Sequence, residues 1–304
     1  MLRSIFLYLS QQERAKRLLV RFAPTRRLAA RFVAGETLAE ATRVASELNA
    51  RGILASLDHL GEHVASRAEA EAARDSYLEA LAEIHRLQLR SGISVKLTQL
   101  GLDFSAEDCA ANLRAVVESA EQRGSFVRVD MEGSAYTERT LALVGEMRRA
   151  HRAVGSVIQA YLYRSENDVR QMIAQSVSVR LCKGAYNEPA SVAYPRKADV
   201  DENYLRLMRL LLSSGQYHAI ATHDARVIEE TRRFASEQKL GPNAFEFQML
   251  YGIRTDLQQR LARDGYRVRV YVPYGGAWFS YFMRRLAERP ANLLFVLKNL
   301  WPGR

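Results

Sequence analysis

The chain has few cysteines, little proline and no long apolar run. Two cysteines among 304 residues, Cys109 and Cys182, cannot supply a disulfide framework, and their spacing matches no zinc motif. No apolar stretch approaches the roughly 20 residues that a membrane-spanning helix needs. The short run Ile5–Leu9 is not followed by a small-residue cleavage site, so we do not expect a secretory signal. These absences favour a globular protein of a reducing compartment, which we expect to be the cytoplasm.

A nucleic-acid partner is not expected either, although the formal net charge is +10. The excess arginine is scattered through the chain, with no basic block interleaved with aromatic residues and no nucleic-acid motif. Residues 1 to about 35 are predicted to form one or two basic amphipathic helices. These helices are most simply interpreted as an arm packed on the barrel. Because basic charge accompanies apolar segments there, peripheral association with the inner face of an anionic membrane is the alternative.

Eight short apolar runs, most of them alternating with polar residues, are the strongest structural signal. Alternation with a period of two is typical of strands, and the roughly 20 to 40 residues between successive runs leave room for a helix. Eight such units predict an α/β fold of the (β/α)8 TIM-barrel type. The runs begin near Ile53, Ile93, Val127, Val157, Val177, His218, Phe245 and Val268.

We expect residues 1–304 to form one domain, with N-terminal helices over 1–51 and the barrel and C-terminal helices over 52–304. Thr37 and Glu40 form a capping box that starts a helix, and Arg51–Gly52 ends that helix before the first strand. The aliphatic face of each strand is expected to meet the helices, so the polar face must line the barrel. Charged groups there are costly unless they meet partners or a ligand.

Active sites of this fold lie where the strands end. Charges of both signs are predicted to converge at that mouth. Each of these residues alone could be a surface residue or part of a structural ion pair, but the whole set indicates a functional site. The residues at the predicted strand ends are Asp58, Lys96, Asp130, Gln159, Arg180, Lys183, Gly184, Ala185, Thr222, His223, Asp224, Gln248 and Tyr271.

A helix predicted from Ala277 carries a second signal. Tyr281, Arg284, Arg285 and Glu288 occupy one of its faces at positions i, i+3, i+4 and i+7. Two adjacent guanidinium groups can bind one carboxylate or phosphate. A solvated face with an Arg284–Glu288 ion pair explains the same spacing equally well.

Two classes of cofactor compete at this point. Arginine, Lys183–Gly184 and the amides of helix N-termini suit a phosphate-bearing cofactor, although no GxGxxG fingerprint follows a strand. His223 with Asp224 is the only close pair of metal-ligating residues near a strand end, so we assign no metal ligands, and metal-assisted hydrolysis is the weaker alternative.

Seven motifs resemble, in their order along the chain, those of the proline dehydrogenase family, and the resemblance extends from Asp58 to Glu288. Each is moderately specific, and their order makes the set highly specific. The length is similar to that of the small monofunctional bacterial enzymes. The motifs are Ser94–Leu100, Val129–Glu132, Val157–Tyr161, Arg180–Tyr186, Ala221–Asp224, Glu246–Gly252 and Tyr281–Glu288.

The resemblance implies a distorted barrel, with an N-terminal helical arm and a final helix over its mouth. It implies an FAD enzyme that oxidises L-proline to Δ1-pyrroline-5-carboxylate and passes the electrons to a membrane quinone. It also implies that Asp130 and Arg180 are catalytic, and that Glu62 pairs with Arg284 as a gate. The implied substrate contacts are Lys96, Leu250, Tyr271, Tyr281, Arg284 and Arg285. The implied FAD contacts are Met131, Gln159, Arg180, Lys183, Gly184, Ala185, Thr222 and His223.

Cys182 departs from the family, which commonly has valine there. Two other classes of function remain open from the residues alone. One is a metal-dependent barrel hydrolase or lyase acting on an anionic substrate, and the other is a non-enzymatic protein that binds anions or a membrane surface.

Overall fold

The computed structural model describes residues 29–61 and 64–288, of which 284–288 are described by their backbone alone. Eight parallel strands close into a barrel in which each strand pairs with its neighbour in sequence and β8 pairs with β1. The strands are β1 (Leu54–His59), β2 (Ser91–Val95), β3 (Val127–Val129), β4 (Val154–Gln159), β5 (Ser178–Cys182), β6 (His218–Ala221), β7 (Phe245–Leu250) and β8 (Arg267–Tyr274). The predicted TIM barrel is therefore confirmed.

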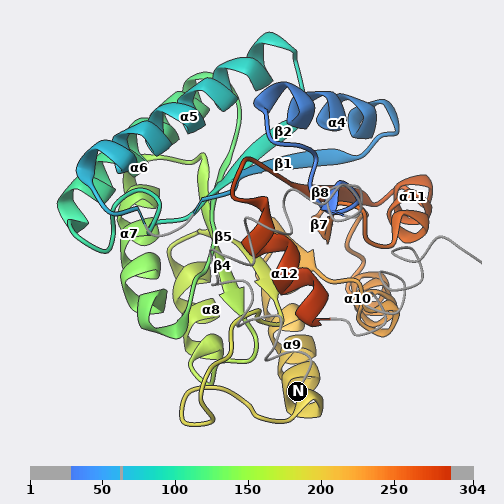
Figure 1. Ribbon diagram of the computed structural model, residues 1–304. Coiled ribbons are helices and arrows are strands. Elements are labelled where there is room, and N and C mark those ends of the chain that lie inside the picture. Colours follow the sequence, from blue (N-terminus) through green and yellow to red (C-terminus); the bar gives the residue numbers. More distant parts are fainter. Residues whose placement is uncertain (1–28, 62–63, 289–304) are drawn as a thin grey trace, which may run out of the picture.

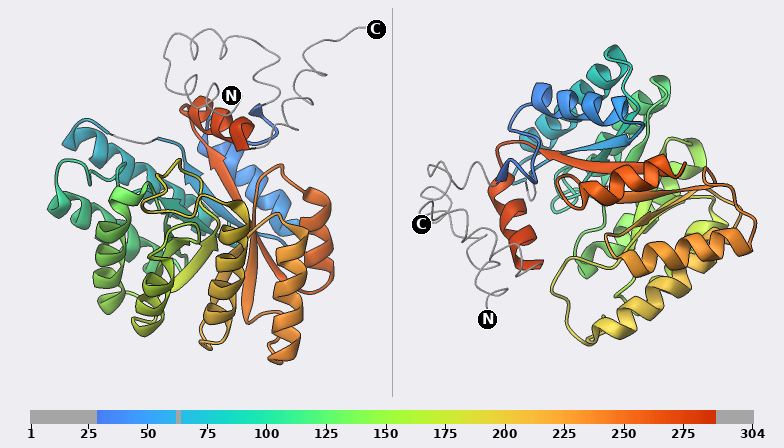
Figure 2. Two further views of the ribbon diagram at one scale, coloured as in Figure 1. Left: turned by 90° about the horizontal axis from the view of Figure 1, so that it is seen from below. Right: turned by 90° about the vertical axis from the view of Figure 1, so that its right-hand side faces the viewer.

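Helices surround the barrel, and the last of them lies across one end of it (Figure 1). Figure 2 shows β8 leading directly into this helix, α12, at the end of the barrel where the strands terminate. The helices are α4 (Leu38–Ala50), α5 (Arg67–Arg86), α6 (Ala106–Gln122), α7 (Thr137–Ala150), α8 (Ser165–Ala174), α9 (Lys197–Leu212), α10 (Ala225–Glu237), α11 (Thr255–Arg263) and α12 (Trp278–Glu288), with a 3₁₀ turn, η1 (Ser134–Tyr136), before α7.

The helix ends follow the local sequence. Thr37 and Glu40 make the predicted reciprocal capping box at the start of α4. Ser105 caps α6, and Asp224 caps α10 by accepting a hydrogen bond from the Arg226 amide. These caps matter for the site, because Asp224 also lies at the barrel mouth.

The main hydrophobic core lies between the barrel and its helices. Outward-facing strand residues such as Val179, Leu181 and Phe247 are fully buried there. A second cluster joins α12 to the described end of the N-terminal arm, where Phe32 and Val33 pack with Phe279 and Phe282. Apolar burial thus holds α12 over the mouth.

The prediction for the fourth strand was wrong by three residues, since β4 begins at Val154 rather than near Val157. Gly155 conceals the alternation in this segment. A side chain at Gly155 would collide with the guanidinium of Arg128 and with the backbone of Ser178. Glycine is therefore needed here to leave room for these two neighbours. The remainder of the predicted N-terminal arm, residues 1–28, falls outside the described part of the chain.

Candidate active site

The barrel interior is polar, and buried charged groups such as Glu246 and Arg128 have the hydrogen-bond and ion-pair partners that offset the cost of burying a charge. Arg269 donates to Glu246 Oε1 at 2.8 Å, and Tyr217 donates to Glu246 Oε2 at 2.8 Å. These contacts, with a hydrogen bond from Gln248, outweigh burial and lower the pKa of Glu246 to about 2. Arg128 is bound by the carbonyls of Ser156 and Ser178.

Strand register brings Lys96 and Asp130 together at the mouth. Val95 and Val129, the last residues of β2 and β3, pair with each other. Lys96 directly follows Val95 and Asp130 directly follows Val129, so the two side chains leave neighbouring strand ends. The Asp130 amide donates to the Val95 carbonyl at 2.9 Å, which extends the pairing by one step. The Lys96 Nζ lies 3.6 Å from Asp130 Oδ2 as a result.

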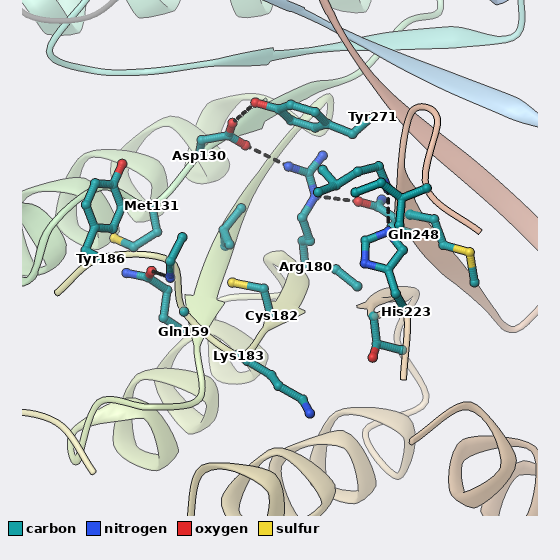
Figure 3. A pocket seen from close by; sticks show the side chains of 18 of the residues that line it. Asp130, Met131, Gln159, Arg180, Cys182, Lys183, Tyr186, His223, Gln248 and Tyr271 are labelled. Carbon is teal, nitrogen blue, oxygen red and sulfur yellow. Dashed lines mark hydrogen bonds and ion pairs between the residues drawn. The ribbon is translucent and has the colours of Figure 1, made fainter. Parts of the chain in front are cut away.

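Asp130 is the centre of a buried network (Figure 3). Arg180 Nη1 donates to Asp130 Oδ1 at 2.7 Å, and the Tyr271 hydroxyl donates to Oδ2 at 2.6 Å. The Arg180 guanidinium also lies over the Tyr271 ring, 5.3 Å from its centroid. One carboxylate therefore joins β5 to β8, two strands that do not pair with each other in the barrel.

Gln248 holds the other side of Arg180. Arg180 Nε donates to Gln248 Oε1, and Gln248 Nε2 donates in turn to Glu246. Arg180 Nη2 donates to Ser94 Oγ at 3.1 Å. With every edge of its guanidinium engaged, Arg180 has a fixed position inside the barrel.

A cavity of about 510 Å³ opens above this network. Its volume is typical of small-molecule sites. Arg180 lies at its centre in Figure 3, with Met131, Gln159 and Cys182 on one side and His223 and Gln248 on the other. The cavity is lined by Lys96, Asp130, Met131, Val157, Gln159, Arg180, Cys182, Lys183, Gly184, Ala185, Tyr186, Lys197, Ala221, Thr222, His223, Asp224, Gln248, Met249, Leu250, Ile253, Tyr271 and Tyr281.

The predicted site residues whose side chains are described line this one cavity, with the exception of Asp58, which is buried outside the lining and binds Lys96. The side chains of Arg284 and Arg285, the predicted carboxylate clamp, and the whole of Glu62, the predicted gate, lie outside the described residues. The backbone places Arg284 and Arg285 in α12, three and four residues after Tyr281, which reaches the cavity.

Lys183 points away from Arg180 in Figure 3, towards α9 and α10. Its Nζ lies 2.5 Å from Asp201 Oδ1 and 2.9 Å from Asp224 Oδ2. Burial opposes the charge on Lys183, but these two carboxylates raise its pKa, so it remains a cation beside the cavity.

Backbone geometry around Gly184 requires glycine. Its φ of +123° is a conformation that other residues rarely adopt, and a Cβ there would collide with the ring of Tyr161. Next to it, the Ala185 amide lies 3.4 Å from Gln159 Oε1. Gln159 Nε2 donates to the Glu132 carbonyl at 3.0 Å, so this amide side chain joins the ends of β3, β4 and β5.

Several cavity residues were not predicted as site residues, among them Tyr186, Lys197 and Ile253. Asp201, which fixes Lys183, was also missed. The only signal for Asp201 is its position four residues after Lys197, and this gives no indication that Lys183 is nearby. Cys182 faces the cavity, as its position in the strand alternation predicts.

The cavity suits an anionic, partly flat ligand. Four cationic and two anionic side chains are among the lining residues, so the described lining carries an excess of positive charge. Val157, Met249 and Leu250 supply apolar surface. Thr222, Gln159 and His223 supply hydrogen-bonding groups. The Leu250 amide donates to His223 Nε2 at 2.9 Å, so the proton of the neutral His223 ring lies on Nδ1.

Within the described ranges, no group of three or more His, Cys, Asp or Glu side chains is arranged to hold a metal ion. In the same residues, no helix combines the length and apolarity that crossing a membrane would require.

A family model described as "Proline dehydrogenase" matches residues 41–298. The chain is 46% identical over 303 residues to "Proline dehydrogenase 1" of Bacillus subtilis, covering 99% of each protein. It is 44% identical over 283 residues to "Proline dehydrogenase" of Deinococcus radiodurans, covering 91% of each.

Solved structures also match. The fold is similar to that of proline utilization A (PutA) from Bdellovibrio bacteriovorus inactivated by N-propargylglycine, with a TM-score of 0.82 and 27% identity over 87% of this chain. PutA from Bradyrhizobium japonicum matches with a TM-score of 0.73 and 26% identity. The chain spans about a third of the length of these PutA proteins.

Proposed function

Because the chain belongs to the proline dehydrogenase family, we propose that it oxidises L-proline to Δ1-pyrroline-5-carboxylate with bound FAD, the first step of proline catabolism, and passes the electrons to a membrane quinone. Residues 1–304 act as one functional domain in this proposal. The observation that carries it is the network of Asp130 with Arg180, Tyr271 and Lys96 at the floor of the cavity.

The chemistry of the lining supports FAD. The excess positive charge is suited to a diphosphate, the polar side chains to a nucleotide, and the apolar surface to a flat ring. FAD would accept the two electrons of the oxidation as a hydride. Met131, Gln159, Arg180, Lys183, Gly184, Ala185, Thr222 and His223 would hold it.

Lys183 is the residue that this proposal assigns to a phosphate. Its two carboxylate partners hold its ammonium at the edge of the cavity, and Gly184 allows the backbone to turn there. Arg180 supplies a fixed cation on the cavity floor, which favours negative charge on a reduced cofactor.

The substrate needs a cationic anchor and a closed apolar pocket. We assign the carboxylate of proline to Lys96, Arg284 and Arg285, and the walls around its ring to Tyr271, Tyr281 and Leu250. Fixing the ring with its C5 hydrogen towards the cofactor would supply several kcal/mol of barrier reduction, on the order of what oriented binding provides. Aromatic walls also exclude water. Glu62 would pair with Arg284 and close the pocket.

Electron transfer to a quinone implies an encounter with the membrane. We assign this contact to peripheral association, for which the net charge of +10 is the supporting observation. Co-sedimentation with vesicles tests it. Binding that rises with the fraction of anionic lipid supports the assignment, and indifference to lipid charge contradicts it.

The absorbance spectrum of the purified protein tests the central proposal. We expect flavin absorbance, and we expect anaerobic L-proline to bleach it. A protein that stays colourless after addition of FAD and requires zinc for activity would contradict the proposal.

A further inference from the structure

Asp58 is a buried carboxylate beneath the proposed substrate pocket. It lies in β1, has no exposed surface and does not line the cavity. Its Oδ1 accepts a hydrogen bond from Lys96 Nζ at 2.9 Å. Its Oδ2, equally buried, has no hydrogen-bond partner among the described residues. An unsatisfied, buried oxygen makes the ionised form of this carboxyl costly.

Asp130, the second carboxylate beside Lys96, differs from Asp58 in this respect. Both of its oxygens accept short hydrogen bonds, from Arg180 at 2.7 Å and from Tyr271 at 2.6 Å, and Lys96 lies 3.6 Å away. Each oxygen of Asp130 therefore has a hydrogen-bond donor, and Lys96 adds an ion pair. Of the two carboxylates that Lys96 contacts, Asp58 is the one with an oxygen that lacks a donor among the described residues.

The groups that face Asp58 are mostly neutral. Burial raises the pKa of Asp58 itself, and it also raises the pKa of the three nearby phenols and lowers the pKa of His59. Lys96 and Asp130 are the charged groups acting on it among the described residues. The titratable groups around Asp58 are Lys96, Asp130, His59, Tyr77, Tyr271 and Tyr274.

The proposed reaction creates a need for such a proton acceptor. The amine of proline is protonated in neutral water, and a hydride cannot leave the carbon next to it until the nitrogen lone pair is free. In an α-amino acid the amine and the carboxylate are attached to the same carbon. A lysine that contacts the carboxylate therefore lies beside the amine as well.

We propose that Asp58 takes up this proton through Lys96, an inference that rests on the proposed function. One N–H bond of the substrate ammonium breaks as a new N–H bond forms on Lys96 Nζ. One of the existing Nζ–H bonds breaks as an O–H bond forms on Asp58 Oδ1. Lys96 remains an ammonium, Asp58 becomes a neutral carboxylic acid, and the amine keeps its electron pair. Asp58 does not touch the substrate and acts on it only through Lys96.

Infrared difference spectroscopy tests the protonation directly. Anaerobic L-proline is added to the flavin-loaded protein, and the spectrum before addition is subtracted. We expect the carbonyl stretch of a protonated carboxylic acid to appear in the wild type and in Asp168→Asn, and to be missing in Asp58→Asn. Its absence from the wild type overturns the inference even where Asp58→Asn fails to fold.

Asp168 provides the matched control. It is buried, its pKa is raised by burial, and it accepts a hydrogen bond from Arg164 at 2.9 Å. It belongs to α8 and does not line the cavity. Its substitution removes the same charge from the protein without touching Lys96.

The pH dependence of flavin bleaching, followed by stopped flow, is the second readout. Without Asp58 only the free-base form of proline reacts. The bleaching rate of Asp58→Asn should therefore be at least about tenfold below that of the wild type at pH 7, and should rise about tenfold per pH unit above it. Asp168→Asn should keep the wild-type profile. An equal loss at every pH in Asp58→Asn would mean a structural role and overturns the inference.

The two proposals fail in different ways. Bleaching by proline without the infrared band removes the role of Asp58 and leaves the proposed function intact. A wild-type flavin that proline does not bleach contradicts the proposed function itself.

Discussion

The hydroxyl of Tyr271 donates a 2.6 Å hydrogen bond to Asp130 Oδ2 across the barrel mouth, from β8 to the end of β3. We expect Tyr271→Phe to lower kcat/KM for proline roughly tenfold to a hundredfold. A hydrogen bond to a charged group contributes about 1.5–3 kcal/mol, and here it orients the carboxylate that holds Arg180. Steady-state kinetics measures the effect, and flavin content is the control. Unchanged kinetics would show that Arg180 alone fixes Asp130.

Tyr271→Ser should narrow the preference for proline over hydroxyproline. The phenol ring is a bulky wall in the proposed pocket, and serine leaves room and a hydroxyl partner for the extra group of hydroxyproline. The ratio of kcat/KM for the two substrates is the measurement. A ratio equal to that of the wild type would remove Tyr271 from the specificity argument.

Arg284→Ala and Arg285→Ala should each raise KM for proline at least about tenfold, because a charge-assisted hydrogen bond to the substrate carboxylate is lost. Flavin should remain bound. Kinetics over a wide range of proline concentration, together with the ratio of flavin to protein, separates the two effects. Loss of flavin with an unchanged KM would contradict the assignment of these residues to the substrate.

Asp201→Asn should weaken FAD binding about tenfold. Asp201 lies 2.5 Å from Lys183 Nζ, and removing its charge leaves Asp224 as the one described carboxylate that holds the ammonium we assign to the cofactor. Asp199→Asn is the matched control on α9, since Asp199 pairs only with the exposed Arg196 among the described side chains. Fluorescence titration of FAD into the flavin-free variants gives Kd. Equal changes in both variants would exclude a specific role for Asp201.

Stability should fall on acidification between about pH 6.5 and 4 because of His218. It is fully buried, its Nδ1 accepts a hydrogen bond from the Val179 amide at 3.1 Å, and burial lowers its pKa to about 4. The unfolded imidazole takes up a proton near pH 6.5, whereas the folded one resists until about pH 4. The stabilisation is present above pH 6.5, and about 3 kcal/mol is lost as pH falls through this interval.

His218→Gln removes that titration. Urea unfolding at pH 7, 6, 5 and 4 should give a flatter dependence of the unfolding free energy in the variant than in the wild type. Parallel curves for the two proteins would mean that His218 does not control stability in this range.

The strand pattern predicted most of the fold because each strand has one face against helices and one face inside the barrel. This constraint acts at every second residue, so alternation in segments such as Ser178–Cys182 is visible in the chain. It was concealed only where Gly155 has no side chain to classify. Strand ends could likewise be placed, and with them Lys96, Asp130 and Arg180.

The sequence by itself determined the eight units, their order and the polar residues at their ends, because these depend on periodicities of two and 3.6 residues along the chain. Only the tertiary structure decided which charges meet. The pairs Lys96–Asp58 and Lys183–Asp201 join side chains from different strands or helices. The distances within these pairs depend on barrel closure and strand register. Both are determined by many contacts between residues far apart in the chain, so no short segment of the sequence indicates them. For the same reason, the chain does not reveal that one oxygen of Asp58 is buried with no hydrogen-bond partner in the described part of the structure.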